Sequence, residues 1–154
     1  MTELDRIRDQ FHRVFSGPAW HGASVLEVLE GISFQEALGR PVPSAHSIGE
    51  LVRHLIAWRT LVVHRLKGDD GHKVTDSLDW PGAAGTEAEW QEDLEQLRST
   101  QRELMLLLGR FNPELLDRQV PGSDVGWYAL FHGLLQHDLY HLGQIGLLRK
   151  ALRA

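Results

Sequence analysis

Three short motifs of the kind that begin a helix constrain the fold of this chain most strongly. Each has a serine or threonine followed three residues later by a glutamate, and each precedes apolar residues at helical spacing: Ser33–Glu36, Ser47–Glu50 and Thr86–Glu89. In such a capping box the hydroxyl accepts a hydrogen bond from a free amide of the first turn. The glutamate in turn accepts one from the amide of the capping residue. Their recurrence indicates a helical chain.

The spacing of apolar residues predicts four long helices and no strand. A short turn of helix is also expected from Ser33. The long helices are expected to cover roughly 4–31 with an interruption at Gly17–Pro18, then 47–68, 86–110 and 124–151. No stretch shows the apolar–polar alternation that is typical of a strand. We therefore expect an all-α fold, an antiparallel four-helix bundle, in a single domain over residues 1–154. Its core is expected to contain Leu51, Leu55, Val62, Leu94, Leu97, Leu104, Leu134, Ile145 and Leu148.

Composition excludes several classes of function. The chain has no cysteine, which excludes disulfides, thiolate metal sites and cysteine nucleophiles. A formal net charge of −5 without a basic stripe argues against a nucleic-acid partner. No apolar run approaches the roughly 18 residues that cross a bilayer, and the first residues lack the apolar region of a secretory signal. We therefore expect a cytoplasmic protein without a membrane or nucleic-acid partner.

Two of the nine histidines stand four residues apart in the last expected helix. His137 and His141 lie about 40° apart on one helical face, so their imidazoles can converge on one ion without distorting the backbone. Helices with an HExxH motif place two metal ligands in the same way. The rest of this face is apolar, which predicts that the pair points into the bundle.

The second long helix offers a third ligand, His54. It lies near the edge of that helix's apolar stripe, so pairing of the second and fourth helices brings it to His137 and His141. Three neutral imidazoles leave the remaining coordination positions of a divalent ion open to water or substrate, as in most catalytic sites. Zinc, nickel, iron and manganese all accept such ligands, so the metal stays open. The alternative is that the histidines are core residues hydrogen-bonded to their neighbours.

Residues around the triad allow more than one interpretation. Asp138 or Gln144 can accept a hydrogen bond from the second nitrogen of a ligand, or both can be solvated. Glu50 is either a general base or only the partner in its capping box. His21 either lines the mouth of the site or packs beside its neighbour. The 69–85 loop, which is rich in Gly, Asp and Pro, is either a lid over the site or a plain connector.

With these motifs in place, the sequence resembles the DinB family, also called DinB/YfiT-like proteins. The resemblance covers nearly the whole chain and rests mainly on segments 45–58 and 132–145, with shorter pieces at 18–22 and 79–81. It implies an up-down-down-up four-helix bundle that frequently forms homodimers. It also implies that His54, His137 and His141 bind a divalent metal, often nickel or zinc. The residue after the last histidine is often arginine in the family and is Leu142 here, which weakens the expectation of an anionic substrate at that position.

Three functions follow as hypotheses. The leading one is a metal-dependent enzyme acting on a small-molecule substrate, in which the ion activates water or an external low-molecular-weight thiol. Characterised relatives of this kind include mycothiol-dependent maleylpyruvate isomerases and bacillithiol transferases. The second is a non-enzymatic metal-binding or stress-response bundle. The third is a helical interaction module whose histidines are satisfied core residues.

Overall fold

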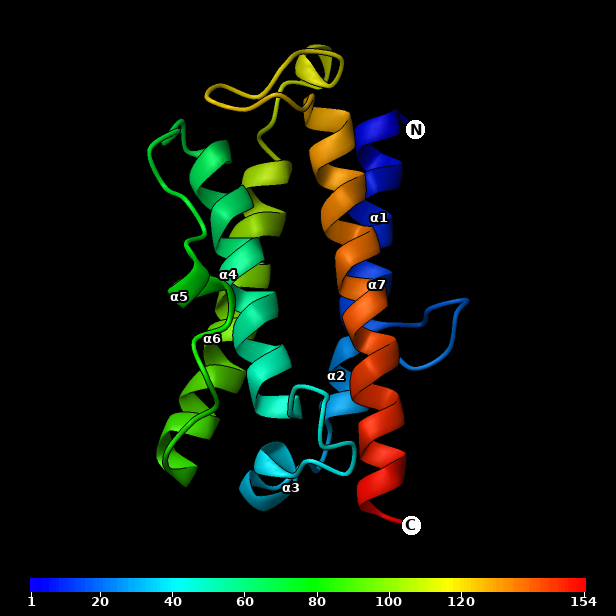
Figure 1. Cartoon of the computed structure of the whole chain (residues 1–154). Coiled ribbons are helices and arrows are strands. Elements are labelled where there is room, and N and C mark those ends of the chain that lie inside the picture. Colours follow the sequence, from blue (N-terminus) through cyan, green and yellow to red (C-terminus); the bar gives the residue numbers. More distant parts are fainter.

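The computed structural model describes residues 1–154, and its regular elements are all helical (Figure 1). This confirms the prediction of an all-α chain. No helix in it combines the length and the apolar character needed to cross a membrane. The elements follow in the order α1 (Glu3–Ser16), α2 (Val25–Leu29), α3 (Phe34–Leu38), α4 (Ile48–Leu66), α5 (Asp76–Asp79), α6 (Glu87–Leu108), η1 (Pro113–Leu115) and α7 (Trp127–Leu152).

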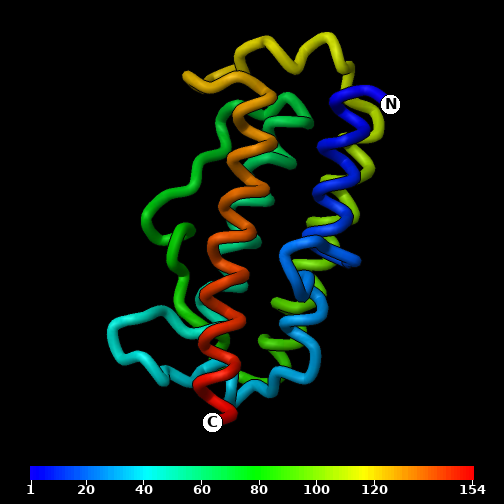
Figure 2. The backbone as a smooth tube through the Cα atoms, turned by 90° about the vertical axis from the view of Figure 1, so that its right-hand side faces the viewer, coloured from blue at the N-terminus to red at the C-terminus, as the bar shows by residue number.

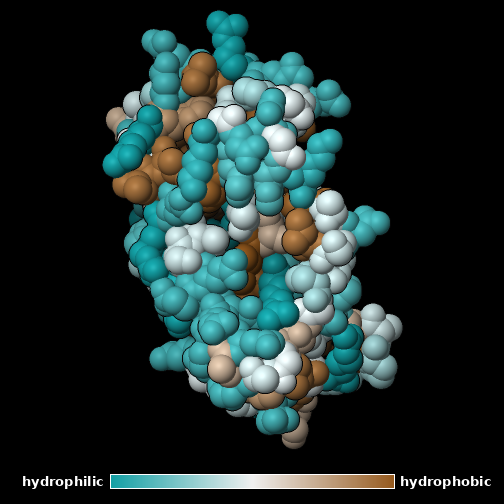
Figure 3. Space-filling model, turned by 90° about the vertical axis from the view of Figure 1, so that its left-hand side faces the viewer, coloured by the Kyte–Doolittle hydropathy of each residue, from teal (hydrophilic) through white to brown (hydrophobic).

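The four longest helices, α1, α4, α6 and α7, extend along the long axis of the molecule. Helices α1 and α7 run in one direction and α4 and α6 in the other, so the two termini lie at opposite ends (Figures 1 and 2). Helix α4 packs against both α6 and α7, and α1 packs against α6 and α7 from the other side. The face seen over α5 and α6 is mostly hydrophilic (Figure 3). Every core residue predicted from the sequence is buried: Leu51, Leu55, Val62, Leu94, Leu97, Leu104, Leu134, Ile145 and Leu148.

Two of the three predicted capping boxes form completely. The hydroxyls of Ser33 and Ser47 each accept a hydrogen bond from the amide three residues on. The carboxylates of Glu36 and Glu50 accept hydrogen bonds from the amides of these serines at 2.8 and 2.7 Å. The third box is only half formed. Thr86 caps α6, but the carboxylate of Glu89 accepts a hydrogen bond from the amide of Gly85 at 2.7 Å instead.

The element boundaries differ from expectation at three places. Helix α1 ends at Ser16, and the helical path resumes only at α2. The 69–85 loop contains the short helix α5. Helix α7 begins three residues later than expected. The reason is that residues 119–126 form a closed turn, in which the amide of Val120 donates to the carbonyl of Val125 at 2.9 Å.

A buried polar chain connects all four long helices. Arg59 of α4 donates to the carboxylate of Asp138 of α7 at 2.7 Å and to the side-chain oxygen of Gln101 of α6. Gln101 then donates to the backbone carbonyl of Phe11 in α1 at 3.2 Å. Both charged side chains are almost fully buried. Removing either would leave an uncompensated charge in the core, which is a strong constraint on how the helices align.

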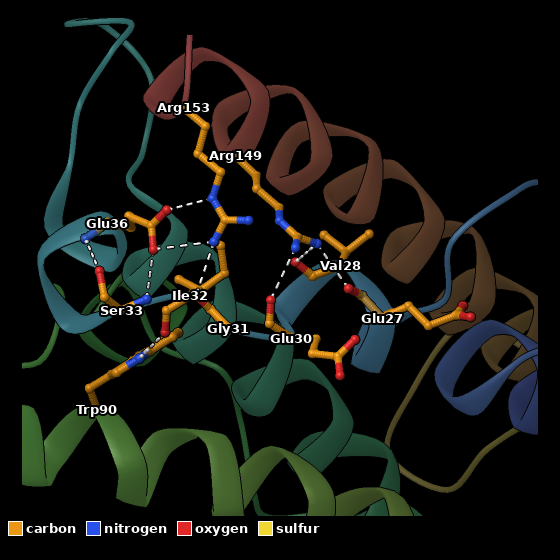
Figure 4. A network of polar contacts seen from close by, with 10 residues as sticks. All are labelled: Glu27, Val28, Glu30, Gly31, Ile32, Ser33, Glu36, Trp90, Arg149 and Arg153. Atoms are coloured by element: carbon orange, nitrogen blue, oxygen red, sulfur yellow. Dashed lines mark hydrogen bonds and ion pairs between the residues drawn. The ribbon is translucent and has the colours of Figure 1, made fainter.

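The C-terminal end of α7 is held by two arginines (Figure 4). Arg149 donates to backbone carbonyls at the end of α2, which a helix leaves without intrahelical partners: those of Glu27, Val28 and Glu30. Arg153 donates to the carbonyl of Gly31 and forms an ion pair with Glu36 at 2.6 Å. These contacts fasten α7, which carries two of the predicted ligands, to α2, to α3 and to the segment between them.

Candidate metal centre

The structure brings the three predicted histidines together. His54 comes from α4, and His137 and His141 come from successive turns of α7. One ring nitrogen from each lies within 4.8 Å of the others, and the Nε2 atoms of His54 and His137 are 2.8 Å apart. His54 and His141 are buried, and His137 is half-buried. This histidine cluster can hold a metal ion.

Asp79 sets the ring orientation of His54. This residue lies at the end of α5, in the 69–85 loop, and not in one of the long helices. Nδ1 of His54 lies 2.7 Å from the backbone carbonyl oxygen of Asp79 and 3.0 Å from its carboxylate. Because a carbonyl oxygen can only accept, Nδ1 must carry the proton, and Nε2 keeps its lone pair for a metal. The Asp79 carboxylate also accepts a hydrogen bond from the indole of Trp58 at 2.8 Å.

His141 is oriented by Gln144, one of the two residues proposed for this role from the sequence. Nδ1 of His141 donates to the side-chain oxygen of Gln144 at 2.6 Å, which again leaves Nε2 as the acceptor. The other proposed residue, Asp138, is turned away from the ligands and pairs with Arg59. Nδ1 of His137 is buried without a hydrogen-bond partner.

The electrostatic environment favours neutral imidazoles. Burial lowers the pKa of His137 to about 3, and the neighbouring His141 and His54 act in the same direction. Burial also lowers the pKa of His141. The two imidazoles of α7 are therefore uncharged at neutral pH, which is the form that coordinates a metal. Three nitrogen donors, two of them with the tautomer fixed by a hydrogen bond, are a donor set that suits a divalent transition metal.

Two aromatic residues cover the outer side of His54. The indole of Trp80 is stacked on the His54 ring with 3.9 Å between ring centroids, and His46 is stacked on the opposite face of the indole at 3.5 Å. The 69–85 loop is thus more than a connector, because Asp79 and Trp80 hold and cover one of the three histidines. In Figure 2 this loop and the segment before α4 lie on the same side of α7. Sequence reasoning did not assign these roles to Asp79 and His46.

The remaining residues singled out from the sequence lie outside the cluster. Glu50 completes the cap of α4 and pairs with Arg40 at 2.6 Å, which favours its capping role. His21 is exposed and lines a groove beside the far face of α7 rather than the mouth of the cluster. Leu142 is buried in the core, so the position that is often arginine in the family contributes no side chain to the histidine cluster.

Comparison with known proteins gives one finding. Neither the curated proteins nor the solved structures compared with the chain include a match. The model of the DinB superfamily matches residues 19–145. That range includes the three histidines as well as Asp79, whose backbone carbonyl orients His54, and Gln144, whose side chain orients His141. Because the match covers most of the sequence, the chain belongs to the DinB superfamily.

Proposed function

We propose that this chain is a metal-dependent enzyme in which His54, His137 and His141 hold one divalent ion. One observation carries the proposal: three ring nitrogens converge between α4 and α7, and two of them have their lone pairs directed inward by partners on the second nitrogen. Histidines that are only core residues hydrogen-bonded to their neighbours would not require three imidazole rings in contact with one another. Burying converging imidazole lone pairs that lack hydrogen-bond donors costs free energy, which a bound ion offsets.

The cluster contains no carboxylate as a fourth ligand. Three protein ligands leave coordination positions for water or substrate, which is the arrangement of catalytic rather than structural sites. A divalent ion supplies Lewis acidity there and lowers the pKa of a bound water or thiol. Asp79 and Gln144 keep the imidazoles oriented, and Trp80 keeps solvent from the outer face of His54. Zinc or nickel suits this donor set best, and iron or manganese is also compatible.

Hydrolysis and thiol transfer are the two reaction types that fit this site. The chain has no cysteine, so a thiol nucleophile has to come from an external low-molecular-weight thiol. We infer that the directions of the four long helices correspond to the up-down-down-up four-helix bundle of this superfamily, which places α4 beside α7 and so creates the site. The alternative function is a non-enzymatic metal-binding or stress-response bundle, and it requires a closed coordination shell.

Metal content of the purified protein tests the proposal. We expect about one divalent ion per chain in the wild-type protein and none in the variant with alanine at His54, His137 and His141, because all three ligands are then missing. The single variant His141→Ala should lose stoichiometric binding while keeping the helical circular dichroism spectrum of the wild type. His12→Ala, which alters an exposed histidine of α1, is the matched control and should retain the ion.

Two outcomes would contradict the proposal. Undiminished metal content in His141→Ala would exclude the three-ligand site. A wild-type protein that takes up no divalent ion even after reconstitution would make the histidines core residues. If the ion is bound, the spectrum of the cobalt-substituted protein distinguishes the two functions. A spectrum that changes on addition of a small thiol or azide indicates an open position, whereas an unresponsive one indicates a closed, structural site.

A further inference from the structure

A cavity of about 390 Å³ lies between α4 and α7 and reaches the metal centre at His137. Helix α4 contributes Trp58 and Val62, and α7 contributes Leu130 and Gly133, which lie about two turns and one turn before His137 at the end of the cavity. Val125 in the turn before α7 forms part of its rim. The volume falls within the range of about 300–1,000 Å³ that is typical of small-molecule sites.

The lining of this cavity is uncharged. Seven of its ten lining residues are hydrophobic, and none is a lysine, arginine, aspartate or glutamate. The carboxylate of Asp79, beside the wall residue Trp58, is occupied by the indole of Trp58 and by His54. An anionic group placed in the cavity would therefore lose hydration without gaining a positively charged partner from the lining, which is costly. An apolar group would gain the free energy of leaving water.

The opposite side of the metal centre has a different character. Because α4 and α7 are antiparallel, residues before His54 lie beside residues after His141. A second cavity of about 360 Å³ on that side includes Ser44, His46 and Gln144. Five of its eight lining residues are hydrophobic, but Ser44 and His46 offer polar partners to a ligand, whereas the first cavity offers only Ser123 beside His137.

We propose that the cavity between Trp58 and Gly133 binds an uncharged hydrophobic group, of about the size of a benzene ring, on the substrate of the metal centre. This proposal rests on the proposed function, because it places that group next to an ion held by His137. The substrates are then compounds in which a metal-binding atom is attached to a neutral apolar group, and the site binds them in preference to small carboxylates.

Gly133 provides a clean way to fill the cavity. A side chain added there meets no atom within 4 Å of its Cβ, and leucine is a better helix former than glycine. Gly133→Leu therefore fills the cavity without displacing the helix or removing a ligand. Gly146 of the same helix also has no atom within 4 Å of an added Cβ, and it lines a different groove. Gly146→Leu is thus the matched control.

Cobalt-substituted protein, whose thiol complexes absorb in the near ultraviolet, is titrated with phenylmethanethiol, 2-sulfanylethanol and sulfanylacetate. We expect phenylmethanethiol to bind at least about tenfold more tightly than 2-sulfanylethanol, the smallest effect anticipated for burying a phenyl-sized group. Sulfanylacetate should bind no more tightly than 2-sulfanylethanol. Gly133→Leu should abolish the preference for the phenyl group and leave cobalt content unchanged, while Gly146→Leu keeps both. Equal affinities in the wild-type protein, or a preference that survives in Gly133→Leu, would overturn the proposal.

A metal-independent measurement separates failure of this proposal from failure of the metal site. N-phenyl-1-naphthylamine is an uncharged fluorophore, and 8-anilinonaphthalene-1-sulfonate is its sulfonated counterpart. We expect the neutral probe to bind the metal-free protein at least about tenfold more tightly than the anion, and to lose this binding in Gly133→Leu but not in Gly146→Leu. If cobalt is not taken up, the proposed function fails. The fluorophores then decide alone whether the apolar cavity exists as a binding site, and equal binding in both variants would exclude it.

Discussion

Replacing Gln144 by leucine tests whether the residues around the triad control its affinity for metal. The side-chain oxygen of Gln144 is the partner of Nδ1 of His141, at 2.6 Å. Leucine has a similar size but no acceptor, so the imidazole loses the hydrogen bond that fixes its tautomer and orientation. Loss of such a partner typically lowers metal affinity 10- to 100-fold, which corresponds to about 1.4–2.8 kcal/mol. Gln144 is only half-buried, so the fold should be little affected.

The assay is a competition titration of zinc or nickel against a chromophoric chelator, with wild type, Gln144→Leu and Gln144→Glu. The glutamate variant keeps an oxygen acceptor at the same position and should bind metal at least as tightly as the wild type, because a carboxylate is the stronger acceptor. Thermal unfolding of the three metal-free proteins shows whether the fold is intact. An affinity of Gln144→Leu within twofold of the wild type would refute the idea that this contact orients His141.

Three further predictions concern stability and assembly. The ion pair with Arg153 lowers the pKa of Glu36 from 4.5 to about 2, so this group stabilises the fold above about pH 4.5 and the contribution is lost as the pH falls toward 2. In thermal unfolding Glu36→Gln should therefore be less stable than the wild type at pH 7, with a difference that vanishes near pH 2; a constant difference would contradict this assignment. Asp138→Leu should destabilise the protein by about 3–5 kcal/mol in urea unfolding, because Arg59 is left buried without its partner, and adding Arg59→Met should recover most of the loss. A double variant no more stable than Asp138→Leu would disprove the ion-pair account. Between Tyr128 and Leu148 the only charged residue of α7 is Asp138, which is buried, whereas Tyr140 and Leu147 are 66% and 65% exposed. We expect the wild-type protein to form a homodimer through this face of α7 and the variant Leu147→Arg to sediment as a monomer. A wild-type protein that is already monomeric would exclude this dimer.

Local regularities made the helices and the triad predictable. Capping boxes and apolar spacing depend on residues that lie one or two helical turns apart. His137 and His141 share a helical face regardless of how the other helices pack. Gln144 lies three residues after His141, close enough in an α-helix for its side chain to reach the ring. The same geometry explains why Asp138 was a poor candidate. It lies at the centre of the buried face that contains Leu134 and Ile145, whereas His137 lies at the edge of that face.

The partners of His54 could not be predicted in the same way. Asp79 is 25 residues away in the chain and belongs to a loop whose path is set by tertiary contacts rather than by a periodic pattern. His46 reaches the site only because Trp80 packs between it and His54. In the sequence, the Asp79–Trp80–Pro81 segment contributes to the family resemblance, but no pattern in it indicates a role for Asp79. What it does for the site became clear from the position of the loop beside α4.

The position of the ligands has a consequence for how the protein is made. His54 and His137 are 83 residues apart, and α7, which supplies two of the three proposed ligands, follows the other three long helices in the sequence. During synthesis a chain that has emerged only as far as α6 therefore presents one ligand, and full affinity for the ion arises when α7 docks. Once bound, the ion acts as a cross-link that closes a long loop, and by the chain-entropy relation for cross-links such a closure stabilises a fold by about 4–5 kcal/mol. If the proposed site takes up its ion, loading of the metal and docking of α7 are then one event.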